Sequence, residues 1–287
     1  MNVKTEAAEF NTQMPPRGKD RTQFLFVLNS VINSHRIDTT SKALIVGGSM
    51  DDADALKHAG FSNISISQFN PDSLPPKNES NDSQNLAIDV EDIQLENESF
   101  DLVFAHEVLH HCRSPHKALC EMLRVAKKYV MFLEPNDSLL MRWLEASRFS
   151  FPYELPAVIH YHGVSGGVRD SQIPNYIYRW NRRDVHKTVS SCIPEIGFTV
   201  VAHPYWDFNI NEYDLSLRKK TRIGLITSLI GQRVFLKMLL GAKTLLNVLP
   251  LTERQGNKFF CVVKKHSELQ PWLSRENGEV VFVGDRK

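Results

Sequence analysis

Hydrophobic residues in this chain form short runs of strand length, separated by stretches in which apolar residues recur at helical spacing. Two such runs, Phe100–Ala105 and Tyr129–Leu133, flank a segment that begins at Pro115 and carries apolar residues on one helical face. A strand, a crossover helix and a second strand in close succession form a right-handed βαβ unit. The pattern therefore predicts part of a parallel sheet between residues 100 and 133.

The same two patterns recur on both sides of this unit. Residues 20–35 place apolar side chains on one face of a leading helix, and residues 183–196 predict another helix. Further apolar runs of strand length lie at 43–46, 64–67, 197–202 and 259–263. Strands and helices that alternate along a chain are typical of an α/β domain.

Polar side chains gather where the two strands of the predicted βαβ unit end. Four residues follow the first strand and Glu134 follows the second; the four are His106, Glu107, His110 and His111. In open α/β sheets, ligands bind at the edge formed by the carboxyl ends of the strands. We therefore expect the chemistry of this protein at that edge.

The segment from His106 to His110 also has the letters of the zinc-peptidase motif H-E-x-x-H. On a helix, His106 and His110 would lie one turn apart and share a metal, with Glu107 as general base. The apolar run before His106, however, predicts that this residue ends a strand. A zinc-dependent hydrolase therefore stays an alternative, and it requires one tightly held zinc ion.

The whole stretch from Ser99 to Asn136 resembles the fourth- and fifth-strand region of class I S-adenosylmethionine-dependent methyltransferases of type 11. The residues that match in order are Ser99–Asp101, Val108–His111, Ala118–Leu119, Glu121, Arg124–Val125 and Glu134–Pro135. The resemblance implies a Rossmann-like α/β fold with a seven-stranded, mostly parallel sheet and helices on both faces. It also implies a methyltransferase that uses S-adenosylmethionine and no metal.

The same resemblance assigns the cofactor to residues at the ends of the first four strands. They are Gly47, Gly48, Ser49, Ser67, Gln68, Asp89, Val90, Ala105 and His106. Two departures from the family pattern stand out. Ser49 and Asp51 stand at the second and third glycines of the first loop. Where the family offers an acid to the ribose, this sequence has Ser67, Gln68 and Asn70, with Asp72 slightly later. These departures keep a further hypothesis open, a methyltransferase-like module that is catalytically silent.

Three carboxylates, Asp51, Asp52 and Asp54, crowd the start of the helix that follows this glycine loop. Helix N-termini attract anions, so carboxylates placed there repel a phosphate group. A zwitterionic amino acid with a sulfonium tolerates them, which favours S-adenosylmethionine over NAD or ATP. Acidic residues also cap helices, and simple capping is an equally good interpretation.

The reaction that the resemblance implies is displacement at the sulfonium methyl by an acceptor oxygen or nitrogen. We expect O-methylation of a small-molecule or glycan acceptor in a biosynthetic pathway. His106 is the first choice for general base, because imidazole exchanges protons near neutral pH. His111 and His162 are second choices, and Glu134 is expected to orient the base or an acceptor amine.

Residues 136–182 interrupt the family pattern with a glycine-rich and aromatic insertion, which we expect to form a lid or acceptor region. The remaining parts are an N-terminal arm at 1–18, a cofactor-binding core at 19–135, the C-terminal half of the core at 183–267 and a tail at 268–287. That half contains a basic amphipathic stretch at 215–252, which can lie on an anionic membrane surface.

Composition narrows the range of partners and compartments. A net charge of +1 gives no sign of nucleic-acid binding. Four cysteines without a CxxC pair indicate free thiols in a reducing compartment. The first residues lack the apolar core of a signal peptide, and no apolar run reaches the length of a membrane span. We therefore expect a cytoplasmic protein, with its oligomeric state left open.

Overall fold

The computed structural model describes residues 22–73, 85–208, 222–249 and 254–284, together with Ile210, Leu215 and Thr252. The arm expected at residues 1–18 lies outside the described residues, as does part of the basic stretch expected at 215–252.

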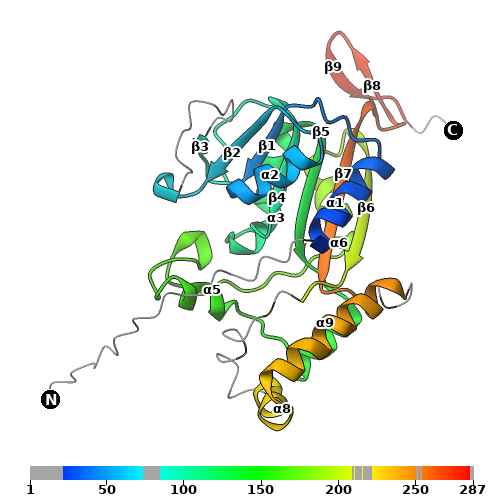
Figure 1. The fold of residues 1–287 in the computed structure, drawn as a ribbon. Coiled ribbons are helices and arrows are strands. Elements are labelled where there is room, and N and C mark those ends of the chain that lie inside the picture. The colour runs from blue at the N-terminus through cyan, green and yellow to red at the C-terminus, as the bar shows by residue number, and fades with distance from the viewer. Residues whose placement is uncertain are drawn as a thin grey trace.

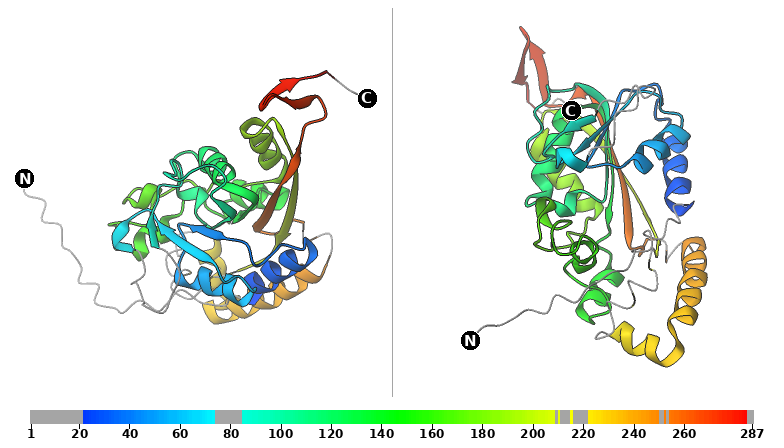
Figure 2. Two further views of the ribbon diagram at one scale, coloured as in Figure 1. Left: turned by 90° about the horizontal axis from the view of Figure 1, so that it is seen from above. Right: turned by 60° about the vertical axis from the view of Figure 1, so that its left-hand side comes forward.

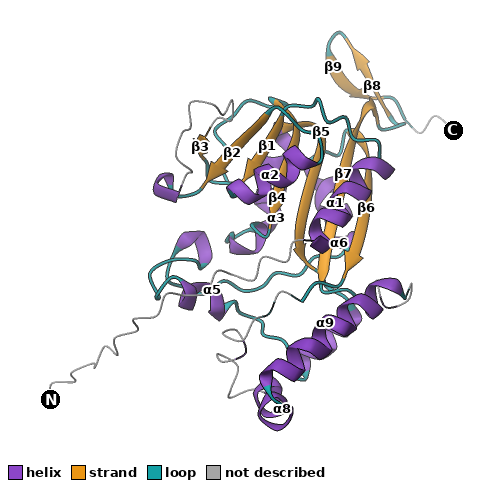
Figure 3. Ribbon diagram, viewed as in Figure 1, coloured by secondary structure: helices purple, strands orange, loops and turns teal. Residues whose placement is uncertain are grey.

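A seven-stranded sheet forms the centre of the fold, in the order β3-β2-β1-β4-β5-β7-β6 (Figures 1 and 3). All neighbouring strands pair in parallel except β7, which runs antiparallel to both β5 and β6. The strands are β1 Ala43–Val46, β2 Ile64–Gln68, β3 Asn85–Ala87, β4 Phe100–His106, β5 Ala126–Pro135, β6 Ile196–Tyr205 and β7 Lys258–Leu269. The predicted seven-stranded, mostly parallel sheet is therefore confirmed.

Helices cover both faces of this sheet (Figure 2). The N-terminal helices α1 (Thr22–Ser34) and α2 (Met50–His58) pack on one face, and α3 (Pro115–Val125) and α6 (Arg182–Cys192) pack on the other. Strand β5 supplies both cores, because successive side chains of a strand point to opposite faces. Val130 and Phe132 pack with α3 and α6, whereas Met131 and Leu133 pack with α1 and α2.

Local sequence signals set the ends of these helices. Pro115 occupies the first turn of α3, and the Ser114 hydroxyl accepts a hydrogen bond from the Lys117 N–H at 3.3 Å. The helix predicted at 183–196 ends earlier, at Cys192, because strand β6 already begins at Ile196. Its actual N-cap is Asn181, whose side-chain oxygen accepts from the Asp184 N–H.

Further elements lie outside the sheet and its two helical layers. The insertion at 136–182 contains α4 (Leu139–Ala146), α5 (Leu155–His160) and a short 3₁₀ turn at Val168–Asp170. Helices α8 (Arg222–Ile230) and α9 (Gln232–Val248) lie between β6 and β7 in the chain. The segment expected as a C-terminal tail contains a hairpin of β8 (Leu273–Glu276) and β9 (Glu279–Phe282).

The expectation of four free thiols is wrong for two of the cysteines. Cys120 of α3 and Cys192 of α6 form a disulfide, with their Cα atoms 5.6 Å apart. The two helices pack side by side on one face of the sheet, which brings residues distant in sequence into disulfide range. Cys112 and Cys261 carry free thiols.

Candidate active site

The topology places a ligand site at the carboxyl ends of β1 and β4. From β1 the chain continues to β2 and β3 on one side of the sheet and then crosses to β4 on the other side of β1. The strand order therefore reverses between β1 and β4. The loop after β1 and the loop after β4 touch there. A Cβ atom added to Gly47, which has a φ of +60°, would lie 2.8 Å from the Val108 side chain. Glycine is therefore required at this contact.

Gly48, the second glycine of this loop, is held by the end of β2. Its N–H donates to the Ser67 carbonyl at 3.1 Å, and the Gln68 amide donates to the Gly48 carbonyl. The Ser67 hydroxyl is fully buried and donates to the Ile45 carbonyl at 3.2 Å. The structure thus places Ser67 and Gln68 in support of the glycine loop.

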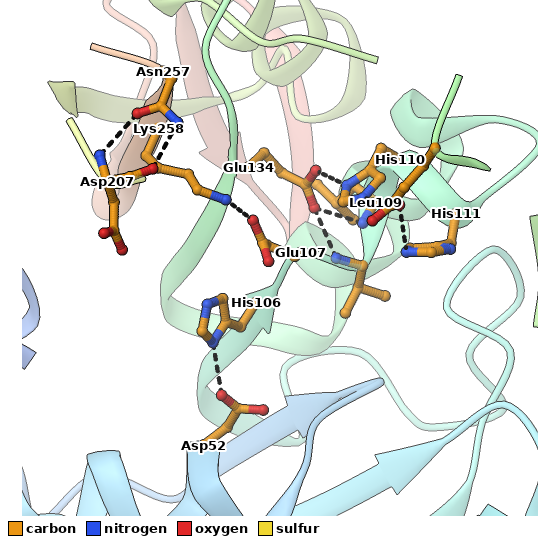
Figure 4. A network of polar contacts seen from close by, with 12 residues as sticks. Asp52, His106, Glu107, Leu109, His110, His111, Glu134, Asp207, Asn257 and Lys258 are labelled. Carbon is orange, nitrogen blue, oxygen red and sulfur yellow. Dashed lines mark hydrogen bonds and ion pairs between the residues drawn. The ribbon is translucent and has the colours of Figure 1, made fainter. Parts of the chain in front are cut away.

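Asp52 caps a helix, which is one of the two interpretations that the sequence left open, and it also contacts His106. Its carboxylate accepts from both the backbone N–H and the hydroxyl of Ser49, each at 2.8 Å, and so caps α2. Its other oxygen lies 2.7 Å from Nδ1 of His106 (Figure 4). Burial of Asp52 raises its pKa, but His106 and Ser49 outweigh burial and hold that pKa at about 2. A buried carboxylate therefore faces the imidazole at the end of β4.

His106 is further fixed by packing. Its ring stacks on Phe24 of α1 with the ring centroids 4.5 Å apart, and 14% of its side chain is exposed. Because Nδ1 is held by Asp52, the ring presents Nε2 for other contacts. Ala105, the residue before it, is fully buried in β4.

Glu107 turns the chain away from β4 and forms an ion pair that the sequence did not indicate. Its φ of +56° is in the left-handed region. Lys258, the first residue of β7, donates to its carboxylate (Figure 4). Burial opposes charge on both groups, yet their mutual attraction lowers the pKa of Glu107 and raises that of Lys258. The partner could not be anticipated, since the two residues lie 151 positions apart.

Glu134 holds the turn that follows Glu107. It is fully buried at the end of β5 and accepts from the backbone N–H groups of Val108 and Leu109 at 2.9 and 2.7 Å. It also lies 2.5 Å from Nδ1 of His110 (Figure 4). Glu134 therefore orients His110, which is not one of the three histidines named as candidate bases.

A second carboxylate approaches the paired histidines from the insertion. Glu154, just before α5, lies 3.2 Å from Nε2 of His110 and 3.4 Å from Nε2 of His111. Burial lowers the pKa of His110, but Glu134 and Glu154 outweigh burial and raise it to about 10. Burial and the neighbouring charge of His110 lower the pKa of His111. His110, His111 and Glu154 thus form one compact polar cluster.

These positions exclude the arrangement of a zinc peptidase. His106 ends a strand, Glu107 has a positive φ, and a 3₁₀ turn begins only at Leu109, so residues 106–110 do not form one turn of an α-helix. The rings of His106 and His110 bind different carboxylates, Asp52 and Glu134.

His162, a second choice for the base, lies exposed beyond the end of α5.

The end of β3 meets the insertion through Arg169. Strand β3 ends at Ala87, and Asp89 and Val90 lie in the turn that follows. The Arg169 guanidinium lies 2.7 Å from the Asp89 carboxylate and 4.9 Å from the ring centroid of Phe69. Val90 is buried in the core. Neither Arg169 nor Phe69 was among the candidate site residues expected from the sequence.

A family model supplies the deciding comparison. Residues 48–133 match the model described as "Methyltransferase domain", and this segment runs from the loop after β1 to Leu133 in β5. The chain carries a methyltransferase domain. It is an enzyme whose cofactor is S-adenosylmethionine. This confirms the family, the activity and the cofactor expected from the stretch around His106.

Solved structures of methyltransferases resemble this one at low sequence identity. Magnesium protoporphyrin IX methyltransferase from Synechocystis PCC 6803, solved with bound S-adenosylhomocysteine, is 13% identical, with a TM-score of 0.43 over 67% of this chain and 79% of its own. A methyltransferase from Methanosarcina mazei is 11% identical, with a TM-score of 0.45 over 83% and 97%. A possible histamine N-methyltransferase from Thermotoga maritima is 13% identical, with a TM-score of 0.39 over 85% and 97%. No curated protein matches this methyltransferase in sequence.

Proposed function

We propose that this methyltransferase transfers the methyl group of S-adenosylmethionine to a hydroxyl group of a small-molecule or glycan acceptor, with His106 as general base. The pair of His106 and Asp52 carries this proposal. A carboxylate that holds Nδ1 fixes the ring and stabilises the imidazolium that forms when Nε2 takes the acceptor proton. The pair also lies at the edge of β1 and β4, where ligands of open α/β sheets bind.

The residues around this edge fit an S-adenosylmethionine group. The glycines at positions 47 and 48 allow the loop backbone to come close to the cofactor, and the buried carboxylate of Asp52 suits a cationic ligand. We assign the methionine part to Gly47, Gly48, Ser49, Ala105 and His106, and the adenosyl part to Asp89 and Val90. Ser67 and Gln68 act through the loop that they support. When bound, the cofactor supplies an electrophilic methyl group.

Arg169 connects the adenosyl side of the site to the insertion. Its guanidinium forms ion pairs with Asp89 and Glu91 and lies over the ring of Phe69. Since Arg169 belongs to residues 136–182, the insertion is tied to the cofactor side as well as to the acceptor side. This supports its proposed role as a lid.

Exposed aromatic rings on the insertion support an acceptor with flat apolar faces, as sugars have. Tyr153 and Tyr176 are 51% and 50% exposed, and their rings meet edge-on with centroids 5.6 Å apart. Tyr153 immediately precedes Glu154, which contacts the paired histidines. Rings in this position combine an apolar surface with a hydroxyl that can bind a polar acceptor.

We also propose that α8 and α9 rest on an anionic membrane surface. Eight of their apolar side chains are between 39% and 84% exposed: Leu225, Leu229, Ile230, Val234, Met238, Leu240, Leu245 and Val248. Arg222, Arg233 and Lys237 are exposed among them, and residues 222–249 contain no acidic residue. This combination of apolar and basic side chains suits an interfacial helix. A surface-bound enzyme would meet a lipid-linked acceptor.

The membrane contact proposed is peripheral. Among the described residues, no single helix is long and apolar enough to cross a membrane. Only together do α8 and α9 have the length and apolar composition of a membrane span, and their axes are bent by 109° relative to each other.

Calorimetric titration with S-adenosylhomocysteine, followed by a methyl-transfer assay on hydroxylated acceptors, tests the main proposal. We expect binding in the micromolar range, which corresponds to about −8 kcal/mol. His106→Ala should reduce turnover by about 10²–10⁴-fold, the usual contribution of a general base. His186→Asn, an exposed histidine on α6, is the matched control and should keep full activity. Full turnover in His106→Ala would remove His106 from the mechanism.

A further inference from the structure

Three side chains of types that commonly bind metal ions converge just beyond β4. His110 and His111 come from the 3₁₀ turn at Leu109–His111, and Glu154 comes from the insertion. One ligand atom of each lies within 4.8 Å of the other two. Two of these residues lie in the first turn after β4, whereas the third is supplied by a segment that the family pattern does not contain.

The distances from the Glu154 carboxylate to the two imidazoles agree with those of a metal centre. The Glu154 carboxylate oxygen lies 3.2 Å from Nε2 of His110 and 3.4 Å from Nε2 of His111. In tetrahedral zinc sites the metal–ligand bonds are about 2.0–2.1 Å long, so two ligand atoms lie about 3.3 Å apart. The two observed separations bracket this value. An ion can therefore enter with small adjustments of the side chains.

The other ring nitrogens of both histidines already have the partners that metal ligands need. Nδ1 of His110 lies 2.5 Å from the buried Glu134 carboxylate, and Nδ1 of His111 donates to the Gly167 carbonyl at 3.4 Å. Histidines that bind metals usually donate their second N–H to a carboxylate or a backbone carbonyl, which fixes the ring and its tautomer. Here both rings are fixed so that Nε2 faces Glu154.

We propose that His110, His111 and Glu154 bind one divalent transition-metal ion of the zinc type, and that the ion's open coordination position receives the acceptor oxygen. This part rests on the proposed function, because the acceptor hydroxyl is then the group that the metal polarises. Three protein ligands with a free fourth position are typical of catalytic zinc sites. The site differs from the peptidase hypothesis, in which His106 was a ligand.

Zinc titration of the full chain tests the site. After treatment with a chelator, we expect the protein to bind one Zn²⁺ per chain in calorimetry. Zn²⁺ is a suitable probe because, for a given set of N and O ligands, it usually binds more tightly than Mn²⁺ or Fe²⁺. Each of His111→Ala and Glu154→Gln should weaken binding at least about 100-fold, since loss of a direct ligand exceeds the usual 10–100-fold effect of an outer partner.

Controls separate loss of the metal site from loss of the fold. His186→Ala removes an exposed histidine from α6 and should bind zinc as the wild type does. The melting temperatures of His111→Ala and Glu154→Gln, measured without metal, show whether these variants are folded. Absence of zinc binding by the wild type, or unchanged binding by both variants, would overturn the proposal and leave the cluster as an ion-pair network.

A parallel titration with S-adenosylhomocysteine distinguishes the two proposals. Protein that binds S-adenosylhomocysteine but not Zn²⁺ refutes only the metal site. Protein that binds Zn²⁺ at the three residues but does not bind S-adenosylhomocysteine refutes the proposed function and keeps the metal site.

Discussion

Asp52 and His106 join the helix after β1 to the end of β4 through a contact of 2.7 Å between Oδ1 and Nδ1. The two strands are neighbours at the point where the strand order of the sheet reverses. The pair therefore couples the start of α2, close to the proposed cofactor loop, to the residue proposed as general base. One carboxylate caps a helix and orients an imidazole.

The stability that Asp52 provides should depend on pH in the acidic range. Its pKa is 3.8 in the unfolded reference and about 2 in the folded protein, so its contribution of about 2 kcal/mol is present above pH 4 and disappears as the pH falls through 2. Urea unfolding should show that Asp52→Asn costs about 2 kcal/mol at pH 6 and about half of that at pH 3. Asp54→Asn, a more exposed position of the same helix, serves as the control. An equal cost of Asp52→Asn at both values of pH would contradict this assignment.

Replacement of Glu134 by alanine should strongly destabilise the enzyme. The variant leaves two backbone N–H groups and the buried His110 without their acceptor. Loss of one partner of a buried ion pair typically costs about 3–5 kcal/mol. Glu134→Gln keeps one acceptor oxygen and should cost less. Chemical denaturation of both variants, with Glu279→Ala on the exposed hairpin as reference, would show whether this order holds.

Gly48 should tolerate no side chain. A Cβ atom at this position would lie 2.1 Å from Cγ2 of Ile45, which is fully buried in β1. We expect Gly48→Ala to distort the loop, lower the melting temperature and weaken S-adenosylhomocysteine binding at least about 10-fold, a loss of about 1.4 kcal/mol. Gly241→Ala is the matched control, because nothing lies within 4 Å of its Cβ and α9 gains a better helix former. Equal effects of the two substitutions would argue against steric closure of the loop.

The proposed membrane surface predicts binding to anionic vesicles. Cosedimentation should be observed with vesicles that contain phosphatidylserine and should decrease with salt, since exposed cations contribute to the attraction. The double variant Met238→Glu/Leu245→Glu places charges on the exposed side of α9 and should remain in the supernatant. Phe282→Glu changes an even more exposed residue on β9, at the opposite end of the molecule in Figure 1, and should still bind. Loss of binding in both variants, or in neither, would exclude α9 as the contact.

Patterns in the sequence were sufficient for most of the fold. Buried strands such as β1 and β4 are apolar at every or nearly every position, and α1 buries one face, so local hydrophobicity determines them. The ends of elements were less accurate, as at Cys192, where the start of β6 decides the end of α6. The pairing of Cys120 with Cys192 was missed because it depends on how two helices pack.

The sequence by itself determined which residues stand at the ends of strands, and therefore that His106 and Glu134 lie at the ligand edge. Only the tertiary structure decided their partners. Lys258 reaches Glu107 across 151 residues, and Glu154 reaches His110 across 44. Hydrophobic periodicity is a property of neighbouring residues, whereas the partner of a buried charge depends on which segments the folded sheet and its insertion bring together.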